Sequence, residues 1–142
     1  MSSVKLNKMI EKLQLVNLVP EVSTDEIEIS SPEINRPALQ LAGYFEHFAS
    51  ERVQIIGYVE YTYLKSLDRD VKMANYEQFL SSDIPCVIYS TRTEPDEDMI
   101  ELAKKYHKPL LSSHRITSDL MAEVIRWLGV ELAPCISIHG VL

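Results

Sequence analysis

Glycine is scarce in this sequence, and the shortage narrows the chemistry that the chain can perform. Only four of its 142 residues are glycine, and they stand far apart, at Gly43, Gly57, Gly129 and Gly140. The sequence therefore contains no G-x-x-x-x-G-K-[ST], G-x-G-x-x-G or G-x-S-x-G motif. This excludes the common phosphate-cradling loops and the nucleophile elbow of hydrolases from these residues.

Cysteine is equally sparse. Cys86 and Cys135 lie in separate apolar stretches and form no C-x-x-C pair, so we expect two reduced, buried thiols and neither a disulfide nor a zinc site. A thiol-dependent enzyme stays open as an alternative, and it requires an exposed thiolate beside a cationic group. Histidine occurs four times, without a paired ligand pattern, and no metal site is predicted. The histidines are His47 and His107, both expected at the surface, and His114 and His139.

Positive charge and long apolar runs are also limited. Lys and Arg number 14 against 21 Asp and Glu, giving a net charge of -7 that would repel a phosphate backbone, so we expect no nucleic-acid partner. The apolar runs, such as residues 86–89, are far shorter than the roughly 20 residues of a membrane-spanning helix. The N-terminus lacks the apolar region of a secretory signal. These features predict a cytoplasmic protein with no membrane partner.

The remaining pattern, with 46% hydrophobic residues, is that of one globular domain in which strands and helices alternate. Short extended pieces are expected at residues 15–19 and 27–30, and buried strands at 53–57, 86–90 and 109–112. Helices are expected at residues 4–13, 38–41, 58–67, 71–80 and 117–129, and a further helix is expected after Pro95 as far as Tyr106. Ser2 and Ser3 are possible N-caps of the first helix, and Thr93 is a possible N-cap of the helix that ends at Tyr106. Gly43 is a plausible stop for the helix at residues 38–41. Strands separated by long helices pair in parallel. The predicted fold class is α/β, with three layers, a mostly parallel sheet of four to five strands, and helices on both faces.

Polar side chains collect where the predicted strands end. Ligands of open parallel sheets bind beyond the carboxyl ends of the strands, and a helix N-terminus beside Arg and hydroxyl groups suits an anion. The candidate anion-binding residues are Asn35 and Arg36, in a loop bracketed by Pro32 and Pro37, and Arg92, His114, Arg115, Thr117 and Ser118. The alternative interpretation makes Thr117 and Ser118 simple helix caps and Arg115 a solvated charge.

Two sequence segments carry a resemblance to a known family. S-P-E-I-N-R-P-A-L-Q-L-A-G-Y-F at residues 31–45 and S-E-R-V-Q-I-I-G at 50–57 closely resemble the N-terminal domain of bacterial HPr kinase/phosphorylase. The order and spacing of P-C-V-I at 85–88, of Thr117-Ser118 and of I-H-G-V-L at 138–142 extend the similarity over nearly the whole chain. Ala38 replaces a glycine usual in the family, which argues for ordinary backbone angles there.

The resemblance implies an accessory α/β domain over residues 1–132. Residues 133–142 are then expected to form a linker and the first strand of a C-terminal P-loop kinase domain. The family's enzymes use ATP and Mg²⁺ to phosphorylate a serine of the phosphocarrier HPr, remove that phosphate by phosphorolysis, and govern carbon catabolite repression as homohexamers. The resemblance places His139 near the transferred phosphate. The alternative is a histidine at a strand terminus without a role.

Two functions follow as expectations. In the first, this chain is non-catalytic alone, because the P-loop is absent from it, and it carries an assembly or regulatory role in the longer enzyme. In the second, it is an independent binding module for a small anion or a nucleotide sugar. The family's N-terminal domain also resembles the uridine-nucleotide-binding domain of peptidoglycan-building ligases, which favours a ligand of that class at the strand ends.

Overall fold

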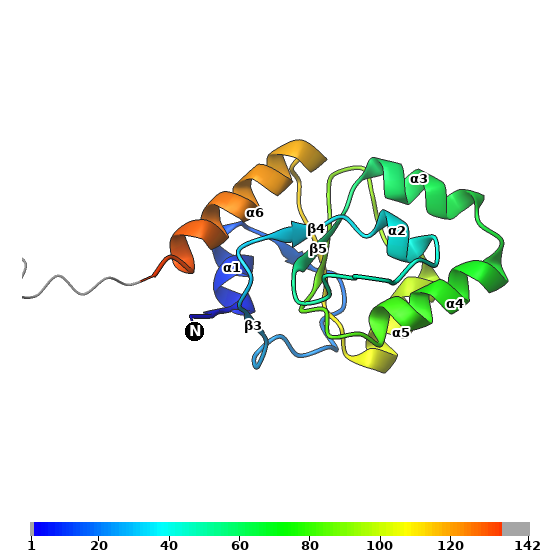
Figure 1. Cartoon of the computed structure of the whole chain (residues 1–142), viewed down its shortest axis with the longest axis horizontal. Helices are drawn as coiled ribbons and strands as arrows, with labels where there is room; N and C mark the ends of the chain where they lie inside the picture. Colours follow the sequence, from blue (N-terminus) through cyan, green and yellow to red (C-terminus); the bar gives the residue numbers. More distant parts are fainter. Residues whose placement is uncertain (1, 135–142) are drawn as a thin grey trace, which may run out of the picture.

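A five-stranded sheet organises the fold (Figure 1). The computed structural model describes residues 2–134. Across the sheet the strands lie in the order β2 (Val16–Asn17), β7 (Leu110–Ser112), β6 (Val87–Tyr89), β5 (Val53–Ile56) and β4 (Ile34–Asn35). Strands β4, β5, β6 and β7 run parallel, and β2 pairs antiparallel with β7 at one edge. The predicted fold class, α/β with a mostly parallel sheet, is confirmed.

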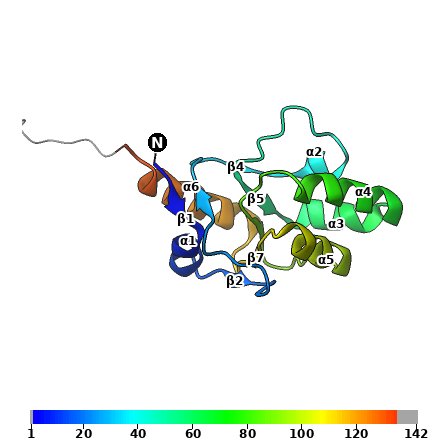
Figure 2. The same ribbon diagram turned by 90° about the horizontal axis from the view of Figure 1, so that it is seen from below.

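Helices cover both faces of this sheet, as Figures 1 and 2 show. On one face lie α1 (Leu6–Lys12) and α6 (Thr117–Glu131). On the other lie α2 (Ala38–Leu41), α3 (Tyr58–Ser66), α4 (Arg69–Leu80) and α5 (Glu97–Tyr106). A separate two-stranded antiparallel sheet joins β1 (Val4–Lys5) to β3 (Glu28–Ile29). None of the helices within residues 2–134 combines the length and apolarity needed to cross a membrane.

The central strands are apolar on both sides because both of their faces are buried. In β5, Val53 and Ile55 join the core under α1 and α6, whereas Ile56 joins the core under α2 to α5. In β6, Ile88 belongs to the first core and Val87 to the second. This is why the strands appear in the sequence as continuous apolar runs, the pattern typical of parallel sheets.

The two ends of the described region lie side by side. The Ser2 hydroxyl donates to the Leu132 carbonyl at 3.1 Å, and the Lys8 ammonium pairs with the Glu131 carboxylate at 2.6 Å. Leu6 of α1 is buried in the same core as α6. The first helix therefore packs against the last one, although more than a hundred residues separate them.

The segment between Pro32 and Pro37, expected to be a loop, contains a strand of the sheet. Ile34 and Asn35 of β4 pair in parallel with Val53 and Gln54 of β5. A residue that precedes proline is forced out of the helical region into extended backbone, the geometry of an edge strand. The expectation of an unpaired loop was therefore wrong, because the segment pairs with β5.

Several expected helix boundaries are also wrong. Ser2 and Ser3 do not cap α1, because Val4–Lys5 pairs with β3 and the helix begins only at Leu6. The cap of α5 is Asp96, whose carboxylate accepts the Met99 amide proton at 2.8 Å. Thr93 instead donates its hydroxyl to the Ser90 carbonyl at 2.7 Å.

Two further boundaries differ by a few residues. Helix α6 continues through Gly129 to Glu131, because Gly129 does not adopt the left-handed backbone with which a glycine ends a helix. The break between α3 and α4 is confined to Leu67 and Asp68, since α4 already begins at Arg69. The short helix α2 is present as predicted, and Gly43 follows it with a left-handed φ of 98°.

Candidate functional site

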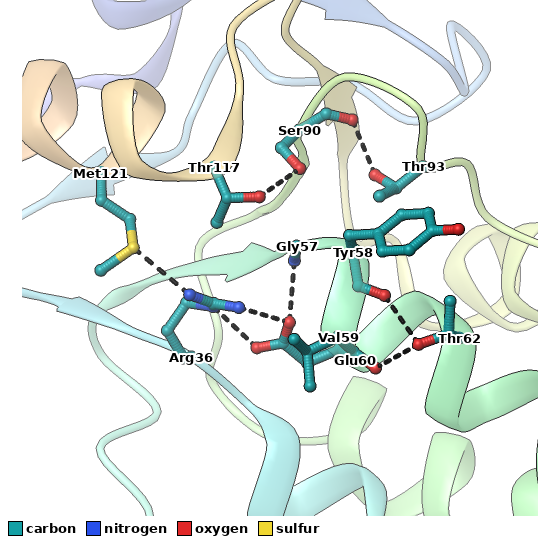
Figure 3. Close-up of polar contacts among 10 residues, drawn as sticks. All are labelled: Arg36, Gly57, Tyr58, Val59, Glu60, Thr62, Ser90, Thr93, Thr117 and Met121. Carbon is teal, nitrogen blue, oxygen red and sulfur yellow. Dashed lines mark hydrogen bonds and ion pairs between the residues drawn. The ribbon is translucent and has the colours of Figure 1, made fainter.

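The carboxyl ends of the parallel strands bring together side chains from four segments (Figure 3). Arg36 follows β4, Gly57 follows β5, Ser90 follows β6, and Thr117 begins α6 after β7. Together with Glu60 of α3 they are called here the strand-end site. The topology alone explains the meeting, because parallel strands end at one edge of their sheet.

A buried ion pair forms the floor of the strand-end site. The Arg36 guanidinium donates from Nε to Glu60 Oε2 at 2.7 Å and from Nη2 to Glu60 Oε1 at 2.5 Å. The Glu60 side chain is only 2% exposed, against 31% for Arg36. Glu60 also accepts the Gly57 amide proton at 3.0 Å. A carboxylate with these donors is fixed in place and joins β4, β5 and α3 at one point.

Gly57 is packed so closely that an added side chain would force its neighbours to shift. A Cβ built on Gly57 would lie 2.6 Å from Thr117 Cγ2, 2.7 Å from Thr117 Oγ1 and 2.8 Å from Arg36 Nη2. Its backbone is extended, so space and not conformational freedom demands glycine here. The close approach lets the start of α6 rest directly on the end of β5.

A second polar contact ties the start of α6 to β6. The Ser90 and Thr117 hydroxyl oxygens lie 2.8 Å apart, and Ser90 is 1% exposed. The Thr91 amide donates to the Arg115 carbonyl at 2.8 Å. The N-cap of α6 is Ile116, which provides no side-chain cap bond. Thr117 is the first residue of the helix and is not its cap, and its hydroxyl contacts Ser90.

Two adjoining hollows open over the strand-end site, and Tyr58 and Thr117 line both. They are called here the strand-end hollows. One has a volume of about 450 Å³ and is lined by Tyr58, Thr91, Arg92, Ile116 and Thr117. The other, of about 370 Å³, is lined by Arg36, Tyr58, Val59, Thr117, Ser118 and Met121. Exposed apolar side chains flank the two arginines, since Tyr58 is 58% and Ile116 55% exposed.

The structure brings four of the candidate anion-binding residues to these hollows, namely Arg36, Arg92, Thr117 and Ser118. The other three lie elsewhere. The Asn35 amide donates to Gln54 Oε1 at 2.8 Å. The Arg115 guanidinium donates to the Leu13 carbonyl at 2.7 Å and lines a separate hollow. His114 is exposed and lines neither strand-end hollow.

Sequence reasoning missed Glu60, Ser90 and Tyr58. Glu60 stands three residues after the N-cap Gly57 and accepts its amide proton, which is the acidic half of a capping box. Gly57 has no side chain to complete the motif, so the sequence signal for Glu60 is weak. For Ser90 and Tyr58 the sequence has no comparable signal, because their position depends on how close α6 comes to the sheet.

Cys86 behaves as a core residue. It is free and fully buried, and desolvation raises the pKa of its thiol to about 12. The expectation of a reduced, buried thiol is confirmed for Cys86, and this residue cannot supply the exposed thiolate of a thiol enzyme. His47 and His107 are exposed as predicted. Cys135 and His139 lie outside the described residues. Between residues 2 and 134, no three His, Cys, Asp or Glu side chains lie close enough to hold a metal ion.

Sequence comparisons match the chain to one group of proteins. HPr kinase/phosphorylase of Lachnoclostridium phytofermentans is 46% identical over 142 residues, which is all of this chain and 46% of that protein. The proteins of the same name from Alkaliphilus metalliredigens and Caldicellulosiruptor bescii are each 40% identical, over 142 and 137 residues. The chain thus spans slightly less than half the length of these relatives.

The fold also occurs in a solved structure with little sequence similarity. The CBS and DRTGG domains of the regulatory region of Clostridium perfringens pyrophosphatase, complexed with the activator diadenosine tetraphosphate, give a TM-score of 0.55 at 16% identity. The match covers 92% of this chain and 47% of that one, and it shows a shared fold. The family model described as HPr Serine kinase N terminus matches residues 4–128. On this match and the full-length identity to its relatives, the chain belongs to the HPr serine kinase N-terminal family.

Proposed function

We propose that this chain is the N-terminal, non-catalytic domain of a bifunctional HPr kinase/phosphorylase. The observation that carries the proposal is the match of the whole chain to less than half of each of three relatives bearing that name. The 142 residues also lack a phosphate-cradling loop motif. ATP binding and phosphate transfer then belong to the remainder of the enzyme.

In this proposal residues 1–132 are the accessory domain and residues 133–142 lead into the kinase domain. The complete enzyme uses ATP and Mg²⁺ to phosphorylate a serine of HPr and reverses the step by phosphorolysis, in the service of carbon catabolite repression. His139 lies near the transferred phosphate, the enzyme is cytoplasmic, and the kinase domains form most of the contacts of a homohexamer. The buried ion pair and the close packing at the strand ends are suited to a domain with a structural, non-catalytic role in the longer enzyme.

The purified 142-residue chain is expected to form no phosphoserine when incubated with ATP, Mg²⁺ and HPr. The same chain extended by the natural downstream half should phosphorylate HPr, because the phosphate loop and the metal ligands come with that half. Mass spectrometry of HPr measures both results. Phosphoserine above background with the short chain would place the active site within these residues and contradict the proposal.

A second function is favoured by the charge of the strand-end hollows. Arg36 and Arg92 line them together with the hydroxyl groups of Thr91, Thr117 and Ser118. None of the described residues that line the two hollows is acidic. Glu60 balances the charge of Arg36, so the surplus positive charge is that of Arg92, and Arg36 contributes the N–H groups that Glu60 does not bind. We propose that these hollows bind a small anion such as a nucleotide sugar, with the phosphates at the arginines and the ring against Tyr58.

Arg92→Gln should weaken such binding about tenfold, because a hydrogen bond to a charged group contributes more than a neutral one. Calorimetric titration with UDP-sugars, sugar phosphates and nucleotides measures the effect. Arg126→Gln is the matched control, since Arg126 is an exposed arginine of α6 that pairs only with Glu123 among the described residues. The absence of heat and of a thermal shift at millimolar ligand would reject this second function.

A further inference from the structure

A cavity separate from the strand-end hollows lies among α3, α4 and the start of α5. It has a volume of about 280 Å³ and is called here the helix-layer cavity. Its walls are Tyr61, Leu64, Lys65, Lys72, Tyr76, Tyr89, Glu94, Pro95 and Asp96. A single water occupies about 30 Å³ in the liquid, so the cavity has room for a molecule considerably larger than water.

The helix-layer cavity is lined by a tyrosine whose hydroxyl makes no hydrogen bond to another described residue. Tyr89 lines it and is 1% exposed, and its hydroxyl has no partner among the described residues. Burial raises the pKa of this hydroxyl, so it stays protonated and can donate. The hydroxyl is therefore free to donate to a molecule in the cavity.

Lys72 supplies further donors in the same cavity. Its side chain is 16% exposed, and its ammonium group donates to Asp96 Oδ2 at 2.8 Å. The Asp98 Oδ2 atom lies 4.0 Å from the same nitrogen, beyond hydrogen-bond distance. An ammonium group has three protons, so the one hydrogen bond leaves capacity for a ligand.

The acceptor beside these donors is already engaged. The Asp96 carboxylate accepts from Lys72, from the Tyr76 hydroxyl at 2.8 Å and from the Met99 amide at 2.8 Å. The Tyr89 hydroxyl is not among these donors to Asp96. The cavity offers donors from Tyr89 and Lys72, which an acceptor on a ligand would complement, and the Glu94 carboxylate in its wall can accept from a ligand donor.

The walls define the rest of the ligand. The side chains of Tyr61, Tyr76 and Tyr89 provide ring surfaces, which favour a flat ring. The charges of Lys65 and Lys72 are balanced in number by those of Glu94 and Asp96, so the cavity has no surplus positive charge for a phosphate. This distinguishes it from the strand-end hollow that Arg92 lines, which has no acidic residue in its lining.

We propose that the helix-layer cavity binds a small uncharged heterocycle that carries a carbonyl group, of the chemical class of nucleobases and nucleosides. The carbonyl oxygen accepts from the Tyr89 hydroxyl and the Lys72 ammonium, and the ring packs among the tyrosines. The site is independent of the proposed kinase role and of the strand-end hollows.

Titration of the ¹⁵N-labelled chain with inosine, adenosine and inorganic phosphate tests this assignment by NMR. Inosine presents a carbonyl where adenosine presents an amino group, so inosine should bind about fivefold more tightly, in proportion to one hydrogen bond. Inosine should shift the amide signals of residues 61–65, 72–76 and 89–96, and phosphate should leave them unchanged. Adenosine or phosphate binding as tightly as inosine, or no shift with inosine, would overturn the proposal.

Tyr89→Phe removes the hydroxyl and keeps the ring, and it should weaken inosine binding about fivefold. Tyr63→Phe is the matched control, because Tyr63 lies on the same helix layer, is 37% exposed and does not line the cavity. Lys72→Met provides a second variant at a less buried position, with the same expected loss. Unchanged affinity in either cavity variant, with the fold verified by its NMR spectrum, would contradict the assignment.

Discussion

Arg36→Met is expected to destabilise the chain by about 3 kcal/mol, because it leaves the buried Glu60 carboxylate without its ionic partner. Glu60 is 2% exposed and would retain only the Gly57 amide among its described donors. Methionine fills much of the space of the arginine stem, so the loss of stability measures the missing charge more than the missing packing. Urea unfolding followed by circular dichroism measures the free energy of unfolding.

Arg69→Met is the matched control for this variant. Arg69 also binds a carboxylate through two nitrogens, with Nε 3.1 Å and Nη2 3.0 Å from the oxygens of Asp98, but its side chain is 70% exposed. Loss of such a surface pair should cost less than about 1 kcal/mol. The double variant Arg36→Met/Glu60→Gln should recover part of the loss, since it no longer buries a lone charge. Equal effects of Arg36→Met and Arg69→Met would show that burial of the pair has no energetic weight.

Gly57→Ala is expected to destabilise the chain by about 3 kcal/mol, because one added methyl group overfills the junction of three segments. The new Cβ would lie 2.6 Å from Thr117 Cγ2 and 2.8 Å from Arg36 Nη2, both inside van der Waals contact. Relief requires α6 to move away from the sheet or the ion pair to shift. Thermal unfolding of the variant measures the cost.

Two companion variants make the steric cause testable. Thr117→Ala removes the two nearest atoms and should restore part of the stability of Gly57→Ala. Gly129→Ala introduces the same methyl group in an exposed turn of α6, where no described atom beyond the adjoining residues and helix backbone lies within 4 Å of the new Cβ. It should stabilise the chain by about 1 kcal/mol. If Gly57→Ala unfolds at the same temperature as the parent chain, the close approach is not a constraint.

The sequence was sufficient to predict the central sheet and most helices, because burial on both faces leaves a strong pattern. The apolar runs of β5, β6 and β7 are visible without any tertiary information. The edge strands β2 and β4 are different, since each has two residues and is defined by its pairing with one neighbouring strand, β7 or β5. Pairing of this kind depends on contacts far along the chain, which local patterns do not contain.

The candidate site was predictable in location and only partly in membership. Strand order places Arg36, Arg92 and Thr117 at one edge of the sheet, and these residues do line the strand-end hollows. Arg115 follows a strand of the same sheet, yet its guanidinium donates to the Leu13 carbonyl, next to the end of α1. Asn35 is held by the buried Gln54. Which way a side chain turns was decided by partners that the local sequence does not reveal.

The packing of α1 against α6 has a consequence for biosynthesis. Leu6 and Met9 share their core with Val124 and Leu128, so the apolar face of α1 has no helix to cover it until the last helix has been made. During translation the apolar face of α1 therefore stays partly exposed to solvent until the ribosome has synthesised α6. Closure of this core can occur only after Leu132 clears the exit tunnel, which makes the emergence of α6 the event that shields the nascent N-terminus from chaperones and proteases.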